Sequence, residues 1–330
     1  MKKNPFLRVA VVLLAITMAS MPVSLTNAKY VSADVEPVNE IRVFQLLPAI
    51  NNTNSGENTS TEYSNCPAGY WAFFVKGRTG SAGSSTNHNG GAPGLVRGIY
   101  HKTNNGAFYV GETWGGGGRG NGGVGRPGKF ITTAKASGSN FPAKDGLASI
   151  VAVAGSGGGA SPNSHGGHAG ASSATGAVAM QGHQNGPGSW PGHSGYASSG
   201  GIQTSNNGTS GGGGALTIGG TGGVHSGNGV TGTWFDGGDA ASGGTLVNVG
   251  GGGGGLYGGG GGGRGSNSGS GGGGSSYSGA ACAVPTTKHP NPTTYFQHAV
   301  NYFIDLGGGG TGTESQAILV WLGPELEAIW

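Results

Sequence analysis

The sequence predicts a mainly β protein with packed polyglycine-II helices in a glycine-rich body, and little or no α-helix in the mature chain. Glycine accounts for 78 of the 330 residues, short apolar and β-branched segments alternate with glycine runs, and no long 3.6-residue apolar period with helix caps occurs. Collagen would require glycine at every third position with much proline. This chain also contains 10 Phe, 10 Tyr and 6 Trp and has a net charge of only +3, which argues against a solvated disordered chain.

The N-terminus predicts a secretory signal over residues 1–28, and therefore a secreted, extracellular or cell-surface protein. Two lysines precede the apolar run 9–19, and a neutral stretch ends in small residues at Ala28, which is the order that signal peptides follow. We expect cleavage after Ala28, with Ala33 as the alternative. The apolar run is shorter than the roughly 20 residues that span a bilayer, so no integral membrane segment is expected after cleavage.

Cleavage would also remove the net charge. Residues 1–28 contain Lys2, Lys3 and Arg8 and no acidic residue, so the 16 basic residues become 13 and balance the 13 acidic ones. Charged side chains are also sparse throughout 146–287. A basic patch for nucleic acid is therefore not expected, and no nucleic-acid partner is predicted.

The mature chain divides by its glycine content. Residues 29–62 contain one glycine and form the predicted N-terminal arm, in which the apolar segment 41–47 favours a short strand that docks on its own body or on a neighbour. A glycine-rich domain follows over 63–323, with an apolar tail over 324–330. Aromatic and β-branched runs predict strands in this domain. These strands are expected at 70–75, 95–100, 107–110, 147–154, 216–218, 245–249, 299–306 and 317–322.

The glycine runs admit two interpretations. Glycine has no Cβ, so polyglycine-II helices, with three residues per turn, can pack closely enough for backbone hydrogen bonds and weak Cα–H···O contacts between helices. The alternative is a flexible linker, as in many Gly/Ser segments. Short apolar strands alternate with the runs, and a simple linker would not need them, so we predict ordered helices.

Export would place Cys66 and Cys282 in an oxidising compartment, where two cysteines usually pair. The sequence therefore predicts a disulfide that encloses the glycine-rich body. Two free thiols or an intermolecular link are the alternatives. Two cysteines do not fill a structural zinc site unaided.

Four motifs follow one another along the domain. They are an aromatic strand at 70–77, a strand pair at 90–98 and 106–111, an alanine-rich strand with glycines at 148–159, and a late glycine block at 250–263 and 271–277. This order resembles the glycine-rich module in the extracellular region of the anaplastic lymphoma kinase and leukocyte tyrosine kinase receptors, a module that also recurs in secreted microbial proteins.

The resemblance spans residues 70–322. It implies strands on a bundle of polyglycine-II helices and no catalytic activity. This chain departs from the receptors in having no recognisable kinase region, only two cysteines and its own tail. The receptors' ligands and signalling are therefore not transferred to it.

Two groups of side chains were considered for chemistry. Five histidines gather in the glycine-rich region, at 165, 168, 183, 193 and 225. His165 and His168 could offer two nitrogens to one metal, but a transition-metal site usually has three or four ligands on a rigid frame, so solvated polar residues are favoured. Asp236 and Asp239 could bind calcium or act as an acid pair, whereas Asp-Gly favours a turn. No catalytic residue, cofactor or metal is predicted.

Five aromatic residues in glycine-rich segments predict either a sticky, sugar-stacking surface or a cover for the body. They are Trp114, Trp190, Tyr196, Trp234 and Tyr257. Tryptophan and tyrosine bring contact area at low entropic cost, which suits adhesion to a cell-surface or glycan partner. The alternative is that they give the glycine bundle the apolar core that glycine lacks.

Apolar segments near both ends predict self-assembly. The residues are Ile41, Val43, Phe44 and Leu46 in the arm, and Ile318, Val320 and Trp321 near the C-terminus. A continuous apolar strand is either central in a sheet or offered to a partner. We therefore predict a non-enzymatic structural or adhesive protein that assembles with itself into a filament or matrix. The alternatives are a monomeric adhesin that binds a glycan or receptor, an ice-binding protein and, last, an enzyme.

Overall fold

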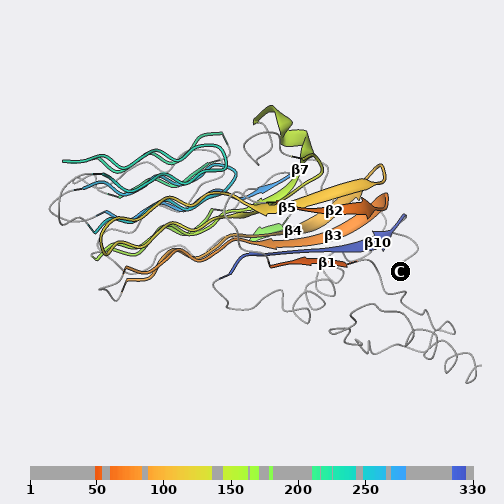
Figure 1. Cartoon of the computed structure of the whole chain (residues 1–330), viewed down its shortest axis with the longest axis horizontal. Helices are drawn as coiled ribbons and strands as arrows, with labels where there is room; N and C mark the ends of the chain where they lie inside the picture. The colour runs from red at the N-terminus through yellow and green to blue at the C-terminus, as the bar shows by residue number, and fades with distance from the viewer. Residues whose placement is uncertain are drawn as a thin grey trace, which may run out of the picture. The chain divides into compact units, whose positions relative to one another are not determined.

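Two antiparallel sheets organise the part of the chain that the structure describes (Figure 1). The structure is a computed structural model that describes residues 49–53, 60–83, 88–135, 144–162, 164–170, 178–180, 210–215, 217–224, 226–242, 248–264, 269–279 and 314–324. All of these belong to one compact unit, residues 42–330. No α-helix occurs among the described residues, and the prediction of a mainly β protein is confirmed.

Sheet A has the order β1-β10-β3-β4-β8. Its strands are β1 (Ala49–Asn52), β3 (Gly69–Lys76), β4 (Leu95–Lys102), β8 (Val178–Met180) and β10 (Gln316–Gly323). The aromatic and β-branched sequences of β3 and β10 suit strands that are buried on both faces. β10 pairs with β1 along one edge and with β3 along the other, so that Leu319 lies between Ile50 and Phe73. The strand nearest the C-terminus is therefore an interior strand of the sheet.

Sheet B has the order β2-β5-β6-β7-β9. Its strands are β2 (Ser60–Cys66), β5 (Gly106–Glu112), β6 (Lys129–Thr132), β7 (Ile150–Ala154) and β9 (Tyr277–Ser278). The short 3₁₀ helix η1 (Lys144–Ser149) leads directly into β7. Sheet B therefore combines four strands from the first half of the described chain with β9, which follows the late glycine runs.

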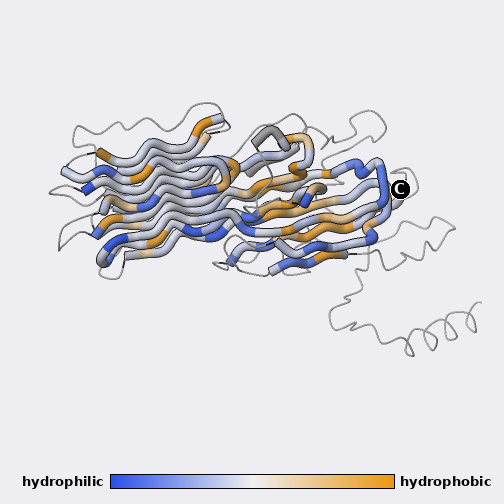
Figure 2. The backbone as a smooth tube through the Cα atoms, turned by 45° about the horizontal axis from the view of Figure 1, so that its top comes forward, coloured by the Kyte–Doolittle hydropathy of each residue, from blue (hydrophilic) through white to orange (hydrophobic). Residues whose placement is uncertain are grey.

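The two sheets share one hydrophobic core. It contains Ile50, Trp71, Phe73, Val75, Val96, Ala317 and Leu319 from sheet A, and Cys66, Phe108, Val110, Ile131, Val151, Ala152 and Ala154 from sheet B. In β3, β5 and β10 alternate residues point into this core, as the period of two requires, whereas β7 contributes the neighbours Val151 and Ala152. Trp71 and Phe108 meet edge to face across it, with ring centroids 5.1 Å apart. Figure 2 shows hydrophobic segments concentrated along the strands, whereas the glycine-rich segments are mostly pale.

The outer faces of both sheets are also apolar. On sheet A the buried residues are Ala72, Phe74, Ile318 and Val320, with Leu322 partly buried beside them. On sheet B, Phe130, Ile150 and Val153 pack against Phe235, Leu256 and Tyr257 from the glycine-rich segments. Sheet B therefore has aromatic and aliphatic residues of the glycine-rich region on its outer face.

The structure corrects the predicted strands at several places. The strand predicted at 216–218 is wrong at Thr217 and Ile218, which form a bend, because glycines on both sides place this segment among the glycine runs. Of the strand predicted at 245–249, Val249 forms only an isolated bridge to Arg119. Residues 147–149 belong to η1 rather than to β7. The strands predicted at 41–47 and 299–306 lie outside the described residues.

Five strands of the structure were not predicted from the sequence. They are β1, β2, β6, β8 and the two-residue β9. β2 is largely polar and crosses the predicted boundary between arm and domain at residue 62. The apolar segment that was expected to be the arm's strand ends two residues before β1 begins. The end of the predicted arm is therefore part of the two sheets.

The glycine runs form a second structural region, which we call the glycine array. Its segments are 77–83, 88–94, 114–128, 155–162, 164–170, 210–215, 217–224, 226–242, 248–264 and 269–276. In Figure 1 these segments run as extended, wavy traces that continue from the ends of the strands. The array begins where the ladder between β3 and β4 ends: Gly77 donates to the carbonyl of Gly94 at 3.1 Å, and Gly80 to that of Gly91 at 2.9 Å.

Candidate functional site: the glycine array and its junction with the sheets

Hydrogen bonds in the glycine array repeat every three residues. In the central segment 250–255, residues three apart donate to the same neighbouring segment. Gly250 and Gly253 donate to Gly269 and Gly272, Gly251 and Gly254 donate to Gly123 and Arg126, and Gly252 donates to Gly238. The same segment accepts bonds from segments 114–119, 155–162 and 257–264. Backbone hydrogen bonds therefore connect 250–255 to neighbours on every side.

Glycine is required where these segments meet. A Cβ atom added at Gly252 would overlap the carbonyl oxygen of Gly259, and one added at Gly260 would overlap that of Thr221. These obstacles are backbone atoms, which cannot move aside as a flexible side chain can. The longest uninterrupted glycine runs, 250–255 and 258–263, are buried throughout, and a Cβ atom at any of their positions would overlap a neighbouring segment.

Side chains appear on the outer segments, again at intervals of three. Ile218, Thr221 and Val224 are all exposed, whereas the intervening Gly219, Gly220, Gly222 and Gly223 are buried. A three-residue spacing directs these side chains to one outward face of the segment. In the sequence, the signal for the outer surface of the array is a side chain at every third residue. The periods of 2 and 3.6 that indicate strands and helices do not contain this spacing.

The predicted histidine pair has a structural role in the array. Nδ1 of His165 accepts a hydrogen bond from the backbone N–H of Asn89 at 2.9 Å, and Nδ1 of His168 accepts one from Ala92 at 2.8 Å. Both rings therefore tie segment 164–170 to segment 88–94. Among the described residues no group of three or more His, Cys, Asp or Glu side chains is placed to hold a metal ion. Residues 183, 193 and 225 lie outside that part of the chain.

The two aspartates take part in a turn and its attachment. Thr233 and Asp236 exchange backbone hydrogen bonds of 2.8 and 3.2 Å, closing a turn in which Phe235 adopts a φ of 59°. Oδ1 of Asp239 accepts a hydrogen bond from the backbone N–H of Gly117 at 2.6 Å. The geometry at these residues therefore corresponds to the turn alternative.

The predicted surface aromatics divide into two groups. Trp234 and Tyr257 meet edge to face with centroids 5.3 Å apart, and both pack with Phe235 against sheet B, so they follow the alternative of an apolar cover. Trp114 is 44% exposed and forms a bridge with Asp236. Trp190 and Tyr196 lie outside the described residues.

Of the two segments predicted for assembly, the structure describes only the one near the C-terminus. Ile318, Val320 and Trp321 belong to β10, both edges of which are paired within the same chain. Their strand follows the central-strand alternative, and within this chain β10 has no unpaired edge over residues 317–320. Ile41, Val43, Phe44 and Leu46 lie outside the described residues.

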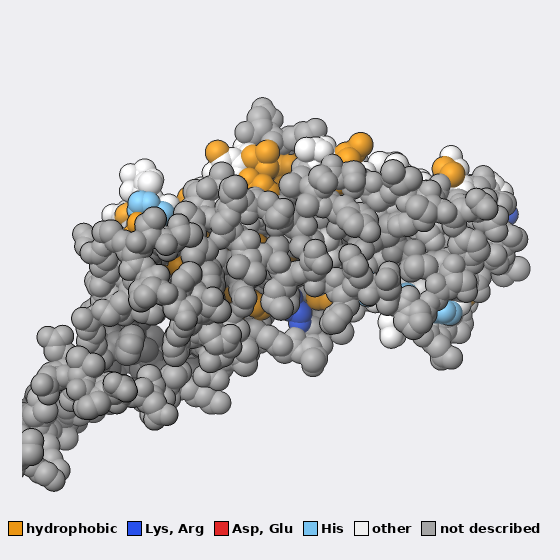
Figure 3. All heavy atoms as spheres, turned by 180° about the vertical axis from the view of Figure 1, so that it is seen from behind, with side chains coloured by type: hydrophobic (Ala, Val, Ile, Leu, Met, Phe, Trp, Pro, Cys, Tyr) orange, Lys and Arg blue, Asp and Glu red, His pale blue; other side chains and the backbone are white. Residues whose placement is uncertain are grey.

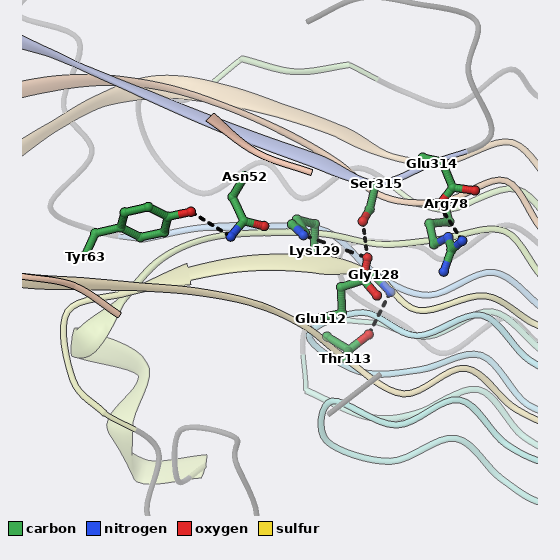
Figure 4. A network of polar contacts seen from close by, with 9 residues as sticks. All are labelled: Asn52, Tyr63, Arg78, Glu112, Thr113, Gly128, Lys129, Glu314 and Ser315. Carbon is green, nitrogen blue, oxygen red and sulfur yellow. Dashed lines mark hydrogen bonds and ion pairs between the residues drawn. The ribbon is translucent and has the colours of Figure 1, made fainter. Parts of the chain in front are cut away.

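A polar cluster lies inside the sandwich where the sheets meet the array (Figure 4). Glu112 and Lys129 face each other across the ladder between β5 and β6, and their side chains are 1% and 0% exposed. Nζ of Lys129 is 3.8 Å from Oε1 of Glu112, and the Ser315 hydroxyl donates to the same oxygen. Arg78 and Glu314 form an ion pair nearby.

Burial lowers the pKa of Lys129 to about 8, because the charged amine loses solvation. The carboxylate of Glu112 opposes this effect, and the positive charge of Arg78 adds to it. The sequence analysis missed both buried residues. A signal was present, since Glu112 follows Phe108 and Val110 at intervals of two, and Lys129 precedes Ile131 by two.

Cys66 is a buried free thiol in the structure. Its Sγ–H donates to the carbonyl of Tyr63 at 3.1 Å. Burial raises the pKa of the Cys66 thiol, while a hydrogen bond from the Phe108 backbone and the charge of Lys102 act in the opposite direction. Cys282 lies outside the described residues, so the predicted disulfide stays a prediction.

Comparison with known proteins gives no family. No protein-family model matches the chain, and no curated protein matches it at a significant level. Among the residues that the structure describes, there is no helix with the length and hydropathy needed to cross a membrane.

Proposed function

We propose that the protein is a secreted, non-enzymatic structural component outside the cell, and that it assembles with itself. The observation that carries the proposal is the three-residue period of the hydrogen bonds in the glycine array. A polyglycine-II helix has three residues per turn, so every third N–H points to the same neighbour. We therefore interpret the segments of the array as polyglycine-II helices packed side by side, as the resemblance to the receptor module implies.

Such an array suits a mechanical role. Its interior positions are held by backbone hydrogen bonds in several directions, of which Gly251 to Gly123 at 3.1 Å and Gly252 to Gly238 at 2.9 Å are examples. Because the segments interlock through the backbone, the array needs few apolar side chains to become rigid. A rigid region that continues from two sheets is useful in a filament or matrix.

The edge of sheet A suggests how copies would join. β1 has only four residues and lies within the predicted arm, and it covers one edge of β10. A β1 strand from a second copy would fit the same edge in the same register, because the two chains are identical. We propose that exchange of β1 links one copy to the next, a contact that extends into a chain when it does not close on itself.

Electron microscopy and sedimentation of the secreted protein test this proposal. We expect filaments or large assemblies from the full protein, and a strictly monomeric particle at high concentration would contradict the proposed function. Deleting 29–53 removes β1 together with the arm residues before it, and should abolish assembly. Deleting 29–48 leaves β1 in place, and separates the contribution of the strand from that of the arm residues before it.

One observation favours a second candidate function, binding of a glycan. Trp114 is 44% exposed, its backbone is bridged to that of Asp236, and Asp239 follows three residues later on the same segment. An aromatic face next to carboxylates is the combination that stacks on a sugar ring and accepts its hydroxyl protons. A glycan array with the secreted protein and its Trp114→Ala variant tests it: saturable binding that the variant loses supports a glycan site.

A further inference from the structure

Three buried side chains carry the functional groups from which an internal amide link is made. Lys129 provides an amine, Glu112 a carboxylate and Asn52 a carboxamide, and their exposures are 0%, 1% and 2%. Glu112 and Lys129 are directly opposite each other on β5 and β6 of sheet B. Asn52 is on β1 of sheet A, two residues after the core residue Ile50, so it also points into the sandwich.

The strand register places Asn52 at the same end of the sandwich as the other two residues. Asn52 lies opposite Ala317 in β10, and Ser315, two positions away, donates its hydroxyl proton to Glu112. The Asn52 amide nitrogen donates to the hydroxyl of Tyr63 at 2.9 Å. Figure 4 shows the amide nitrogen of Asn52 pointing toward Tyr63 and its oxygen pointing toward the side on which Lys129 is drawn.

The noncovalent arrangement leaves buried polar atoms without partners. Oδ1 of Asn52 and Oε2 of Glu112 are buried and have no hydrogen-bond partner among the described residues. Unsatisfied buried polar atoms are costly, and native structures contain few of them.

We propose that Lys129 and Asn52 are joined by an amide bond between their side chains, and that Glu112 carries the proton in the reaction that forms it. The link removes the buried ammonium charge and turns the carboxamide of Asn52 into a secondary amide. It fastens β1, the four-residue edge strand, to β6 in the facing sheet.

The reaction needs no oxidant, reductant or cofactor. Lys129 reacts as the neutral amine. Its Nζ attacks Cγ of Asn52, and a bond forms between Nζ and Cγ. The Glu112 carboxylate accepts the proton that Nζ loses and passes it to the amide nitrogen of Asn52 as the Cγ–Nδ2 bond breaks, so that nitrogen leaves as ammonia. The products are one amide and one ammonia, and Glu112 is again a carboxylate.

The Lys129–Asn52 link does not depend on assembly. Whether β1 is exchanged between copies decides only whether the link lies within one chain or joins two chains. If β1 stays on its own body, the link lies within one chain and the protein remains a monomer on a denaturing gel. If β1 is exchanged, the same link joins successive copies and produces a ladder on that gel. Either product contains the same Lys129–Asn52 bond.

Mass spectrometry of the secreted protein tests the bond directly. Trypsin does not cut after an acylated lysine, nor between Arg126 and Pro127. We therefore expect segment 43–76 joined to segment 120–135, with a mass one ammonia below the sum of the two peptides. Cleavage after Lys129 with an unmodified 43–76 peptide would overturn the proposal, and this readout requires no variant to fold.

Variants identify the role of each group. We expect Lys129→Gln to give two separate peptides at full mass, and Glu112→Gln to reduce linked peptide at least tenfold in soluble protein. Asn52→Asp should still link but lose water in place of ammonia. Lys102→Gln is the matched control, since Lys102 is also a buried lysine of the sandwich, and it should leave the linked peptide unchanged. A linked peptide that persists in Lys129→Gln would overturn the assignment.

Discussion

Phe130 on β6 and Phe235 in the glycine array meet edge to face, with ring centroids 5.3 Å apart and an interplanar angle of 70°. Both side chains are buried, at 1% and 0% exposure. Phe235 adopts a φ of 59°, a left-handed conformation that is uncommon for a bulky residue. A buried ring in this conformation indicates that its packing compensates for the backbone strain, and that the array is attached to sheet B by side chains as well as by backbone bonds.

The Phe235→Ala variant is expected to weaken this attachment. Removing a buried phenylalanine typically costs about 3–5 kcal/mol, because apolar contacts are lost and a cavity remains. Urea unfolding monitored by circular dichroism measures the change. Ile218→Ala is the control, since Ile218 is 54% exposed, and should change stability by about 0.5 kcal/mol or less. Equal losses in the two variants would contradict the role given to Phe235.

Replacing a central glycine of the array by alanine should be strongly destabilising. In Gly252→Ala the new methyl group overlaps the backbone of Gly259, and the surrounding segments cannot move apart without losing hydrogen bonds. We expect a loss of about 3 kcal/mol or more, at the upper end of the range for overpacked cores.

Gly146→Ala in η1 is the matched control for this prediction. Its new Cβ would meet only the Ser149 hydroxyl oxygen at 3.6 Å, an ordinary contact. The control should unfold within about 1 kcal/mol of the unsubstituted protein, because alanine also restricts the unfolded chain. If Gly252→Ala were as stable as the control, the close packing of the array would be disproved.

Strands with strong local signals were predictable from the sequence, and those defined by their partners were not. β3 and β10 contain aromatic and β-branched runs, and both were predicted nearly at their observed bounds. β2 is the polar sequence Ser60–Cys66, and it becomes a strand because the edge of β5 is available to it. β1 likewise pairs only along β10, which comes more than 260 residues later. Such long-range pairings leave no local pattern in the sequence.

In the candidate site, features that depend on composition were predictable, and contacts between distant segments were not. Glycine composition indicated close backbone packing, but the Cys66 to Cys282 link and the role of the arm stay predictions. The histidines were considered for a metal, and their Nδ1 atoms instead accept backbone hydrogen bonds from a segment that the sequence does not place beside them. The Lys129–Glu112 pair was not predicted, because these two residues are isolated along the chain and meet only through the register of β5 and β6.

The Cys66 thiol is expected to be unreactive in the native protein. The thiolate is the reactive form, and burial of Cys66 both raises the pKa of its thiol and blocks access to reagents. We expect labelling by iodoacetamide at pH 7 to be at least tenfold slower than in urea with reductant. Labelling in urea without reductant decides whether Cys66 is a free thiol, as it is in the structure, because only a free thiol is modified. A disulfide to Cys282 would instead prevent labelling until reductant is added.

The rate at which the Lys129–Asn52 link forms should follow the fraction of Lys129 that is a neutral amine, and this fraction depends on pH. Only the neutral amine can attack, and burial lowers the pKa of Lys129 from 10.5 to about 8. Below pH 8 the neutral fraction therefore falls about tenfold for each pH unit, and above pH 8 it is nearly constant. In the unfolded chain the pKa is that of an ordinary lysine and Asn52 is distant, so the link should not form there.

This dependence can be measured on chain that is purified in denaturant and then diluted into buffers between pH 5 and pH 9 at fixed ionic strength. Acid quenching followed by mass spectrometry gives the linked fraction with time. We expect the rate to rise with pH and to level near pH 8. Glu112 and Arg78 act on the same amine, and Arg78→Gln, which removes a positive charge near Lys129, should move the levelling point to higher pH. A rate that is independent of pH over this range would contradict attack by the Lys129 amine.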